Sequence, residues 1–154
     1  MDLSLNREKL ESCAECTCFN LRKASRAITQ LFDRAMKNSG LRGTQFSILA
    51  VLSALGTGTI TRLSEILVMD RTTLTRNLKP MENAGLIKIA QGSNLRSKAV
   101  SLTKKGHQTL AGTFPHWKRT QDLIIEKLGR ERFNYLIRDL SEISEMFSAR
   151  GSAG

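Results

Sequence analysis

The chain has 154 residues with 24 basic and 14 acidic side chains, a net charge of +10, and this length fits one domain with a sizeable core. It contains no run of about 18 apolar residues and no signal-peptide pattern, so we expect a cytoplasmic protein with no membrane partner. Nine basic and three acidic residues lie between positions 59 and 105. Such clustering favours a nucleic-acid partner over a basic surface that serves solubility alone.

The N-terminal region combines a polar stretch with three closely spaced cysteines. Residues 2–11 predict a short helical or frayed arm, and Cys13, Cys16 and Cys18 follow it. In a reducing compartment this spacing argues against a structural disulfide framework. On a helix, Cys16 and Cys18 lie about 200° apart, so the three thiols cannot converge on a metal ion within one subunit. We interpret them first as small hydrophobic residues, while a redox switch or a site shared across a dimer axis stays open.

A long amphipathic helix is predicted from Cys16 to near residues 38–40. Its apolar positions recur at intervals of three and four: Leu21, Ala24, Ile28, Leu31, Phe32, Ala35 and Met36. Its opposite face is basic, and we interpret that face as solvated or DNA-facing: Arg22, Lys23, Arg26 and Arg34. An alternative assigns Phe19, Arg22 and Arg26 to the binding of a small effector that carries an aromatic ring and a carboxylate.

Two shorter elements are predicted next. Thr44 is placed as the N-cap of a helix that Gly56 closes. The core side of this helix carries apolar residues at helical spacing: Phe46, Leu49, Ala50, Leu52 and Leu55. The stretch from Thr59 to Thr61 predicts a short strand that lies beside a later hairpin.

Residues 60–86 predict two helices joined by a tight turn. Asp70 is placed as the N-cap of the second helix, which then starts at Arg71. Pro80 predicts a kink or a tightened turn because it offers no N–H to the carbonyl of Arg76, but the apolar face continues beyond it. The first two turns expose cationic and hydroxyl side chains without an acidic one, as suits phosphates and base edges in a major groove: Arg71, Thr72, Thr73, Thr75 and Arg76.

A β-hairpin is predicted immediately after this helix. Gly85 is placed as the C′ cap, residues 86–90 and 98–102 form two strands, and Arg96 lies near the tip of the loop between them. A recognition helix followed by such a hairpin is a winged helix. For the helix pair alone, the alternative is a surface pair in an all-α domain with a solvated basic side.

The C-terminal third predicts two more helices, residues 107–128 and 130–147, separated by Gly129 and with an interruption at Pro115. Together with the first long helix they hold more large apolar side chains than a winged helix needs for its own core. The surplus implies a second copy of the chain as partner, and the alternative is a helical cap folded onto the same chain. Residues 149–154 are expected to be disordered.

The predicted fold is therefore mainly α with a small β-hairpin wing. Residues 1–42 form the arm and the first dimerisation helix, 43–105 the winged helix-turn-helix, and 106–148 the C-terminal dimerisation helices. The lone histidines His107 and His116 are interpreted as helix-surface or packing residues. In the absence of a phosphate-cradling loop, a nucleophile elbow or paired carboxylates, we expect neither an enzyme nor a cofactor or metal.

Three segments of the chain resemble the MarR family of transcriptional regulators. They are TQFSIL at 44–49, DRTTLTRNLKPMENAGLI at 70–87 and RSKAVSLT at 96–103, and the order of the predicted elements is also that of the family over nearly the whole chain. The resemblance implies a homodimer whose first and last two helices interlock and place two winged helices on successive faces of the major groove.

The resemblance also implies roles for individual residues. By position, Thr72, Thr73 and Arg76 reach base edges, whereas Arg71, Thr75 and Lys79 lie nearer the DNA backbone. Arg96 enters the adjacent minor groove, and Thr44 and Gln45 meet a phosphate. One departure concerns the wing, where Asn94-Leu95-Arg96 stands in place of the Asp-Arg-Arg that the family often carries, so the carboxylate that steadies the arginine is missing.

The function implied by this resemblance is sequence-specific binding of double-stranded DNA at a pseudo-palindromic operator, with repression as the commoner role. A small aromatic or anionic compound is the expected releasing signal. Two alternatives stay open: a cysteine-based redox-sensing regulator, and a winged-helix module that binds protein.

Overall fold

The computed structural model describes residues 12–92 and 97–148, and within them the chain is mostly helical with one small sheet. The predicted fold class is confirmed. In chain order the described elements are η1 (Ser12–Glu15), α2 (Thr17–Ala35), η2 (Lys37–Ser39), α3 (Gly43–Leu55), β1 (Thr57–Thr59), α4 (Ile60–Ile66), α5 (Arg71–Asn83), β2 (Ile87–Gln91), β3 (Lys98–Leu102), α6 (Lys104–Leu128) and α7 (Arg130–Phe147). The two η elements are single turns of 3₁₀ helix.

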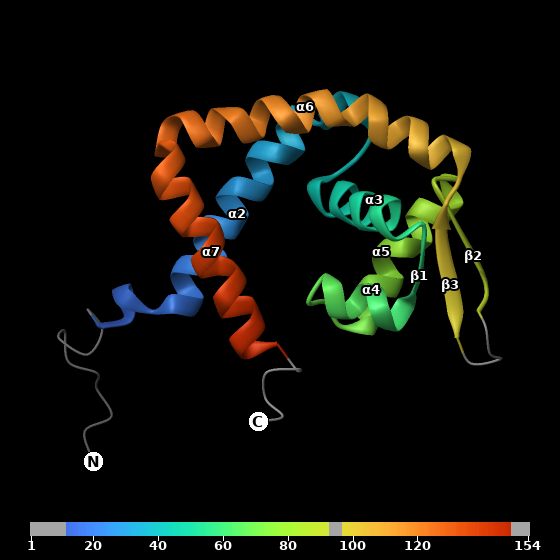
Figure 1. Cartoon of the computed structure of the whole chain (residues 1–154), viewed down its shortest axis with the longest axis horizontal. Helices are drawn as coiled ribbons and strands as arrows, with labels where there is room; N and C mark the ends of the chain where they lie inside the picture. Colours follow the sequence, from blue (N-terminus) through green and yellow to red (C-terminus); the bar gives the residue numbers. More distant parts are fainter. Residues whose placement is uncertain (1–11, 93–96, 149–154) are drawn as a thin grey trace, which may run out of the picture.

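The long helix α6 connects two parts of the molecule (Figure 1). Its first half lies over α3, α4, α5 and the three strands. We call these three helices and three strands together the winged-helix lobe. The second half of α6 lies over α2 and leads into α7, which turns back beneath it. Among the described helices, none combines the length and the apolar character that crossing a membrane would require.

The hydrophobic core sits mainly in the winged-helix lobe. It takes side chains from the helices of the lobe, from the sheet and from the connection between α2 and α3: Met36, Leu41, Phe46, Ile48, Leu49, Leu52, Leu63, Leu74, Leu78, Met81, Leu86, Ile87, Val100 and Leu102. Burying one such side chain contributes roughly 1.5–3 kcal/mol. Leu74 and Leu78 are fully buried, so the core holds the inner face of α5 and leaves its other face to the solvent.

The three strands form an antiparallel sheet in the order β1-β3-β2. In its register Thr59 lies opposite Ala99, and Ile87 lies opposite Leu102. Of the hairpin strands, β3 has the predicted bounds and β2 begins one residue later than predicted, whereas the prediction of a strand at 59–61 is wrong by two residues. Thr59 ends the strand because its hydroxyl accepts the N–H of Arg62 at 3.1 Å, and this capping bond starts α4.

The start of α3 also differs from the prediction, because Thr44 is not the N-cap. The helix begins at Gly43, whose N–H donates to the Asp33 carboxylate at 2.6 Å, and Gln45 Oε1 accepts the N–H of Arg42 at 3.0 Å. The cap is thus supplied by a residue of α2, ten positions earlier. The preceding helix α2 ends at Ala35, earlier than predicted, and the turn η2 fills the interval.

Both helices that contain proline are continuous. As expected, α5 runs through Pro80. The predicted interruption of α6 at Pro115 is wrong, since the helix runs from Lys104 to Leu128. Pro115 and Ala111, whose carbonyl loses its helical partner, are exposed, so solvent can satisfy that carbonyl while packing on either side holds the helix. Gly129, with φ of 79°, separates α6 from α7 as predicted.

Candidate nucleic-acid interface

The turn before α5 positions this helix through a charged cap. Asp70 accepts the N–H of Thr73 at 2.8 Å, and the N-cap predicted from the sequence is confirmed. Hydrogen bonds from Thr73, through its side chain and then its backbone, hold the pKa of the Asp70 carboxyl below its ordinary value. Val68 closes the turn with φ of 47°, and the N–H of Met69 donates to the carbonyl of Ser64 at 2.9 Å.

The outer face of α5 is cationic and rich in hydroxyl groups. Successive helical residues are about 100° apart, so the side opposite the buried Leu74 and Leu78 carries Thr72, Arg76 and Lys79, all of them exposed. Thr72 and Arg76 lie one turn apart on this side. The face can therefore present one hydroxyl and two cations to a single ligand surface.

One flank of α5 borders a cleft that also involves the wing. The cleft has a volume of about 480 Å³ and lies between α5, the start of α4 and the base of β3. Its lining consists of Thr59, Ile60, Thr61, Arg71, Thr75, Ser97 and Lys98. Among these described residues there are two cations, several hydroxyl groups and no carboxylate, a composition that suits a phosphate group.

Five residues that line this cleft, Thr61 and Lys98 among them, were not predicted as site residues from the sequence. They are distant in sequence from α5, and the pairing of Thr59 with Ala99 brings the start of α4 next to the base of the wing. The available signal was the basic, hydroxyl-rich composition of the return strand, but its proximity to Arg71 depends on the sheet register.

The other residues singled out from the sequence occupy more varied places. Thr73 is half-buried on the far flank of α5, where its backbone N–H serves the Asp70 cap. Thr44 is exposed in the first turn of α3, and Gln45 is half-buried with its amide oxygen used by Arg42. Arg96 lies outside the described residues. The proposed DNA contacts of these residues stay predictions.

A second cavity, of about 270 Å³, lies between α2, α3 and α6. It is lined by Ile28, Thr29, Phe32, Met36, Gly43, Thr44, Phe46, Ser47, Leu67 and Trp117. The rings of Phe46 and Trp117 stack with centroids 5.7 Å apart. Among the described lining residues there is no basic side chain, and the polar side-chain groups are hydroxyls and the indole N–H of Trp117, so the chemistry favours an aromatic ligand with few charges.

The effector residues predicted from the sequence lie elsewhere, on the exposed face of α2. Arg22 and Arg26 border a shallow hollow together with Leu21 and Ser25. Phe19 is not among the lining residues of that hollow, and its ring instead lies 5.4 Å from the ammonium of Lys23. The structure therefore brings the two arginines together without the aromatic ring.

The three cysteines are exposed at the start of α2. Cys13 lies in η1, Cys16 occupies the N-cap position of α2 and Cys18 lies in its first turn. The single helix on which their predicted geometry depended therefore begins only after Cys16. Within residues 12–92 and 97–148, no three His, Cys, Asp or Glu side chains are grouped so as to hold a metal ion.

Comparison with known proteins gives consistent matches. The family model described as MarR family matches residues 41–97. The chain is 37% identical to the M. tuberculosis transcriptional regulator MosR, crystallised in complex with DNA, over 84% of this chain and 96% of that one, with a TM-score of 0.76. It is 27% identical to the transcriptional repressor CouR, bound to a 23-mer DNA duplex, over 92% of this chain and 99% of that one, with a TM-score of 0.77.

A curated sequence relative comes from Bacillus subtilis (strain 168). It is the uncharacterized HTH-type transcriptional regulator YwoH, 28% identical over 88 residues. The match covers 57% of this chain and 64% of the relative, which is less than two thirds of the relative's length.

Proposed function

Because this chain belongs to the MarR family of transcription regulators, we propose that it is a cytoplasmic, sequence-specific DNA-binding protein. It acts as a homodimer on a pseudo-palindromic operator whose half-sites lie about one helical turn apart. Its role at the promoter is repression.

The observation that carries this proposal is the outer face of α5. Asp70 fixes the start of the helix, Leu74 and Leu78 hold its inner face, and Thr72 and Arg76 are left exposed beside the cationic cleft. In the proposed complex Thr72, Thr73 and Arg76 meet base edges. Phosphates are bound by the remaining exposed groups of the helix and by the cleft: Arg71, Thr75, Lys79, Thr61 and Lys98. The similarity to MosR and CouR, whose structures were both solved with bound DNA, supports this assignment.

The apolar surfaces of α2 and α7 support the homodimer. Neither helix, both of them described along their whole length, contains a buried side chain. On α7 most of the apolar side chains gather on one face, with Leu136 42% and Phe147 79% exposed. Exposed apolar faces of this size on two amphipathic helices mark a contact surface, and a second copy of the chain covers both at once.

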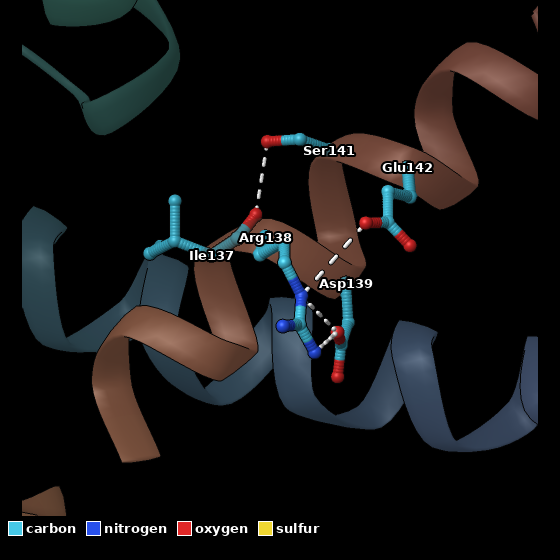
Figure 2. Close-up of polar contacts among 5 residues, drawn as sticks. All are labelled: Ile137, Arg138, Asp139, Ser141 and Glu142. Atoms are coloured by element: carbon cyan, nitrogen blue, oxygen red, sulfur yellow. Dashed lines mark hydrogen bonds and ion pairs between the residues drawn. The ribbon is translucent and has the colours of Figure 1, made fainter. Parts of the chain in front are cut away.

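The opposite face of α7 carries polar side chains that form hydrogen bonds and ion pairs with groups of the same helix (Figure 2). Arg138 donates to Asp139 at 3.1 Å and lies 3.8 Å from the Glu142 carboxylate, and the Ser141 hydroxyl bonds back to the carbonyl of Ile137 at 2.9 Å. Exposed ion pairs of this kind stabilise a helix only slightly. They leave the apolar face as the part of α7 that a partner would cover.

Release from DNA is proposed to follow the binding of a small aromatic compound, with or without an anionic group, in the cavity between α2, α3 and α6. Thr44 and Ser47 belong to the winged-helix lobe, whereas Ile28 and Phe32 belong to a helix that carries the dimer face. A ligand that fills this cavity therefore contacts both parts of the molecule. It can shift the lobe only to the extent that it binds one arrangement more tightly than the other.

Ligand binding is testable through Trp117, the single tryptophan of the chain. Phenols and aromatic carboxylates that enter the cavity should change its fluorescence and weaken DNA binding. The variant Ser47→Leu, which fills the cavity, should lose both responses. The variants Arg22→Ala and Arg26→Ala should keep both responses, and their loss would instead place the effector on the exposed face of α2.

A second candidate function is redox sensing, favoured by the exposed positions of Cys13, Cys16 and Cys18 at the start of a proposed dimerisation helix. Oxidation of two thiols by peroxide would form one disulfide, reducing one peroxide to two waters. Nonreducing electrophoresis after mild peroxide treatment separates the two candidates. A redox sensor changes mobility and loses DNA, whereas a ligand-responsive repressor keeps its DNA under the same treatment.

The experiment that tests the main proposal is binding to the DNA upstream of the protein's own coding region, followed by selection from random duplexes. Tight, sequence-selective binding that falls by roughly 10³-fold or more between 50 and 200 mM salt is expected of about six or more phosphate contacts. Weak binding that is insensitive to salt would favour a winged-helix module that binds protein. A footprint without two-fold symmetry would contradict the dimeric operator.

A further inference from the structure

The end of the recognition helix is joined to the start of α6 by hydrogen bonds between residues about twenty positions apart. Three successive carbonyls follow α5, and each accepts a donor from the segment 103–105. Ala84 O accepts Lys105 Nζ at 2.8 Å, Gly85 O accepts the Thr103 hydroxyl at 2.6 Å, and Leu86 O accepts the Thr103 N–H at 3.1 Å. We call this set of contacts the α5–α6 joint.

Two local features prepare these carbonyls for the joint. Gly85 has φ of 70°, which lets the chain turn out of the helix, and the N–H of Leu86 donates to the carbonyl of Met81 at 2.9 Å. The carbonyls at the C-terminal end of a helix carry partial negative charge, so the ammonium of Lys105 is favourably placed there. The exit from α5 is therefore both sterically defined and electrostatically matched to the start of α6.

Thr103 serves both helices with one hydroxyl group. Its oxygen donates its proton to Gly85 O and accepts the N–H of Gly106 at 3.0 Å, which is the N-cap bond of α6. Gly106 is buried, and a methyl group added at its Cα would collide with the carbonyl of Leu86. The absence of a side chain at Gly106 therefore allows the contact between the two helix ends.

The helix that starts at this joint is long enough to act as a rigid connection. With 25 residues, α6 spans about 37 Å. It leads from the α5–α6 joint to α2 and α7, the helices with the exposed apolar faces (Figure 1). In a dimer held by those faces, the separation and orientation of the two recognition helices depend on the angle at each joint.

The geometry points to Thr103 as a positioning residue that sets the half-site spacing the dimer accepts, although it lies outside the proposed DNA contacts. This inference rests on the proposed function. One additional base pair moves a half-site by about 3.4 Å and rotates it by about 34°. A dimer with a stiff joint therefore binds the altered operator weakly, whereas a dimer with a loose joint binds it almost as tightly as the natural one. Lys105 acts with Thr103 by binding the carbonyl of Ala84, the residue that directly follows the helix.

The test compares duplexes that carry the selected operator with its natural spacing, with one base pair added or removed, and with a single half-site. The native protein is expected to prefer the natural spacing by at least about tenfold, the equivalent of one net hydrogen bond or more. Thr103→Val, which keeps the shape but removes the hydroxyl, should reduce that preference to about twofold. The affinity of Thr103→Val for the single half-site should equal that of the native protein. Thr103→Ser, which keeps the hydroxyl, should show the spacing preference of the native protein.

A second pair of variants keeps the test independent of a folding defect in Thr103→Val. Lys105→Met removes the bond to Ala84, and Lys104→Met removes the same charge from the neighbouring exposed position. The first should relax the spacing preference and the second should leave it as in the native protein. If all variants keep the spacing preference of the native protein, the inference is overturned. It is also overturned if Thr103→Val and Lys105→Met lose as much affinity for the single half-site as for the full operator, because such a loss indicates damage to the winged-helix lobe alone.

Amide hydrogen exchange without DNA separates a failure of this inference from a failure of the proposed function. If the native protein binds none of the duplexes, the proposed function fails, and the joint is then judged by exchange at Leu86 and Gly106. Exchange at least about tenfold faster in Thr103→Val, with the Leu49 and Leu78 amides still protected, supports the joint as the connection between the helices. Unchanged exchange at both positions overturns it.

Discussion

Replacing Arg76 by alanine should weaken binding to the operator while leaving binding to unrelated DNA unchanged. Arg76 is exposed on the face of α5 opposite Leu74 and Leu78, so the substitution leaves the core intact and the stability of the fold should not change. The loss then reports the DNA contact alone. A bidentate arginine–guanine contact contributes about 1–3 kcal/mol, which corresponds to about 5- to 160-fold in affinity.

Lys79 provides the matched control, because it is a cation on the same exposed face, one turn nearer the end of the helix. As a phosphate contact, Lys79→Ala should weaken operator and scrambled duplex equally and lower the salt slope by about one. The assay is a fluorescence anisotropy titration of both duplexes at several salt concentrations, with thermal unfolding as a check on folding. Equal losses of Arg76→Ala on the two duplexes would refute the assignment of this residue to base recognition.

Three further predictions concern the cleft, the dimer face and the helix cap. Lys98→Ala should weaken all duplexes alike and reduce the salt slope by about one, and a loss confined to the operator would contradict a phosphate role for the cleft. Leu136→Asp should dissociate the dimer in analytical ultracentrifugation because it places a charge in the apolar face of α7, whereas Asn134→Asp, the same charge on the polar side of that helix, should not. Asp70→Asn keeps a capping oxygen but removes the charge. Since the pKa of Asp70 is lowered by its bonds with Thr73, the charged carboxylate stabilises the fold at pH values above its ordinary pKa of about 3.8, and this contribution is lost as the pH falls through the lower pKa of the folded state. The melting temperature of the native protein should therefore exceed that of Asp70→Asn at pH 7, with a difference that shrinks in acid. A difference that stays the same from pH 7 into acid would argue against a role for the charge.

The winged helix-turn-helix was predictable because its signals are local. Asp70 lies directly before the cationic helix, Gly85 is the second residue after its end, and the two strands of the hairpin are close in sequence. Each of these residues acts on backbone within a few positions of itself. The amphipathic helices α2 and α7 were equally predictable from the sequence, because an exposed apolar face has the same helical period as a buried one.

The errors arose where tertiary contacts replaced a local signal. Thr44 has the chemistry of an N-cap, but Asp33 reaches the start of α3 from another helix and moves the boundary to Gly43. Pro115 carries a strong breaking signal, yet the packing of α6 on either side of it overrides the signal. The sequence around Thr44 does not indicate the contact with Asp33, and the sequence around Pro115 does not indicate the packing of α6.

The candidate site was only partly predictable for the same reason. Exposed residues of α5 follow from the helical period, whereas the cleft beside them requires the register that brings Lys98 close to Thr61 and Arg71. The α5–α6 joint likewise depends on Thr103 meeting Gly85 across the whole hairpin. The position of Thr103 before a helix predicts the N-cap bond to Gly106, but it does not predict the hydrogen bond to Gly85 at the end of α5.

If α2 and α7, which contain no buried side chain, form the proposed dimer interface, DNA binding depends on the concentration of the protein. Most of the stability of a helix in a protein comes from the packing of its amphipathic face, so in the proposed dimer part of the stability of α2 and α7 comes from the second copy, and folding and assembly become linked. Stability then rises with protein concentration. Dilution below the dimer dissociation constant lowers the amount of dimer with the square of the concentration, so operator occupancy falls more steeply than the protein level and small changes in synthesis give a sharpened response.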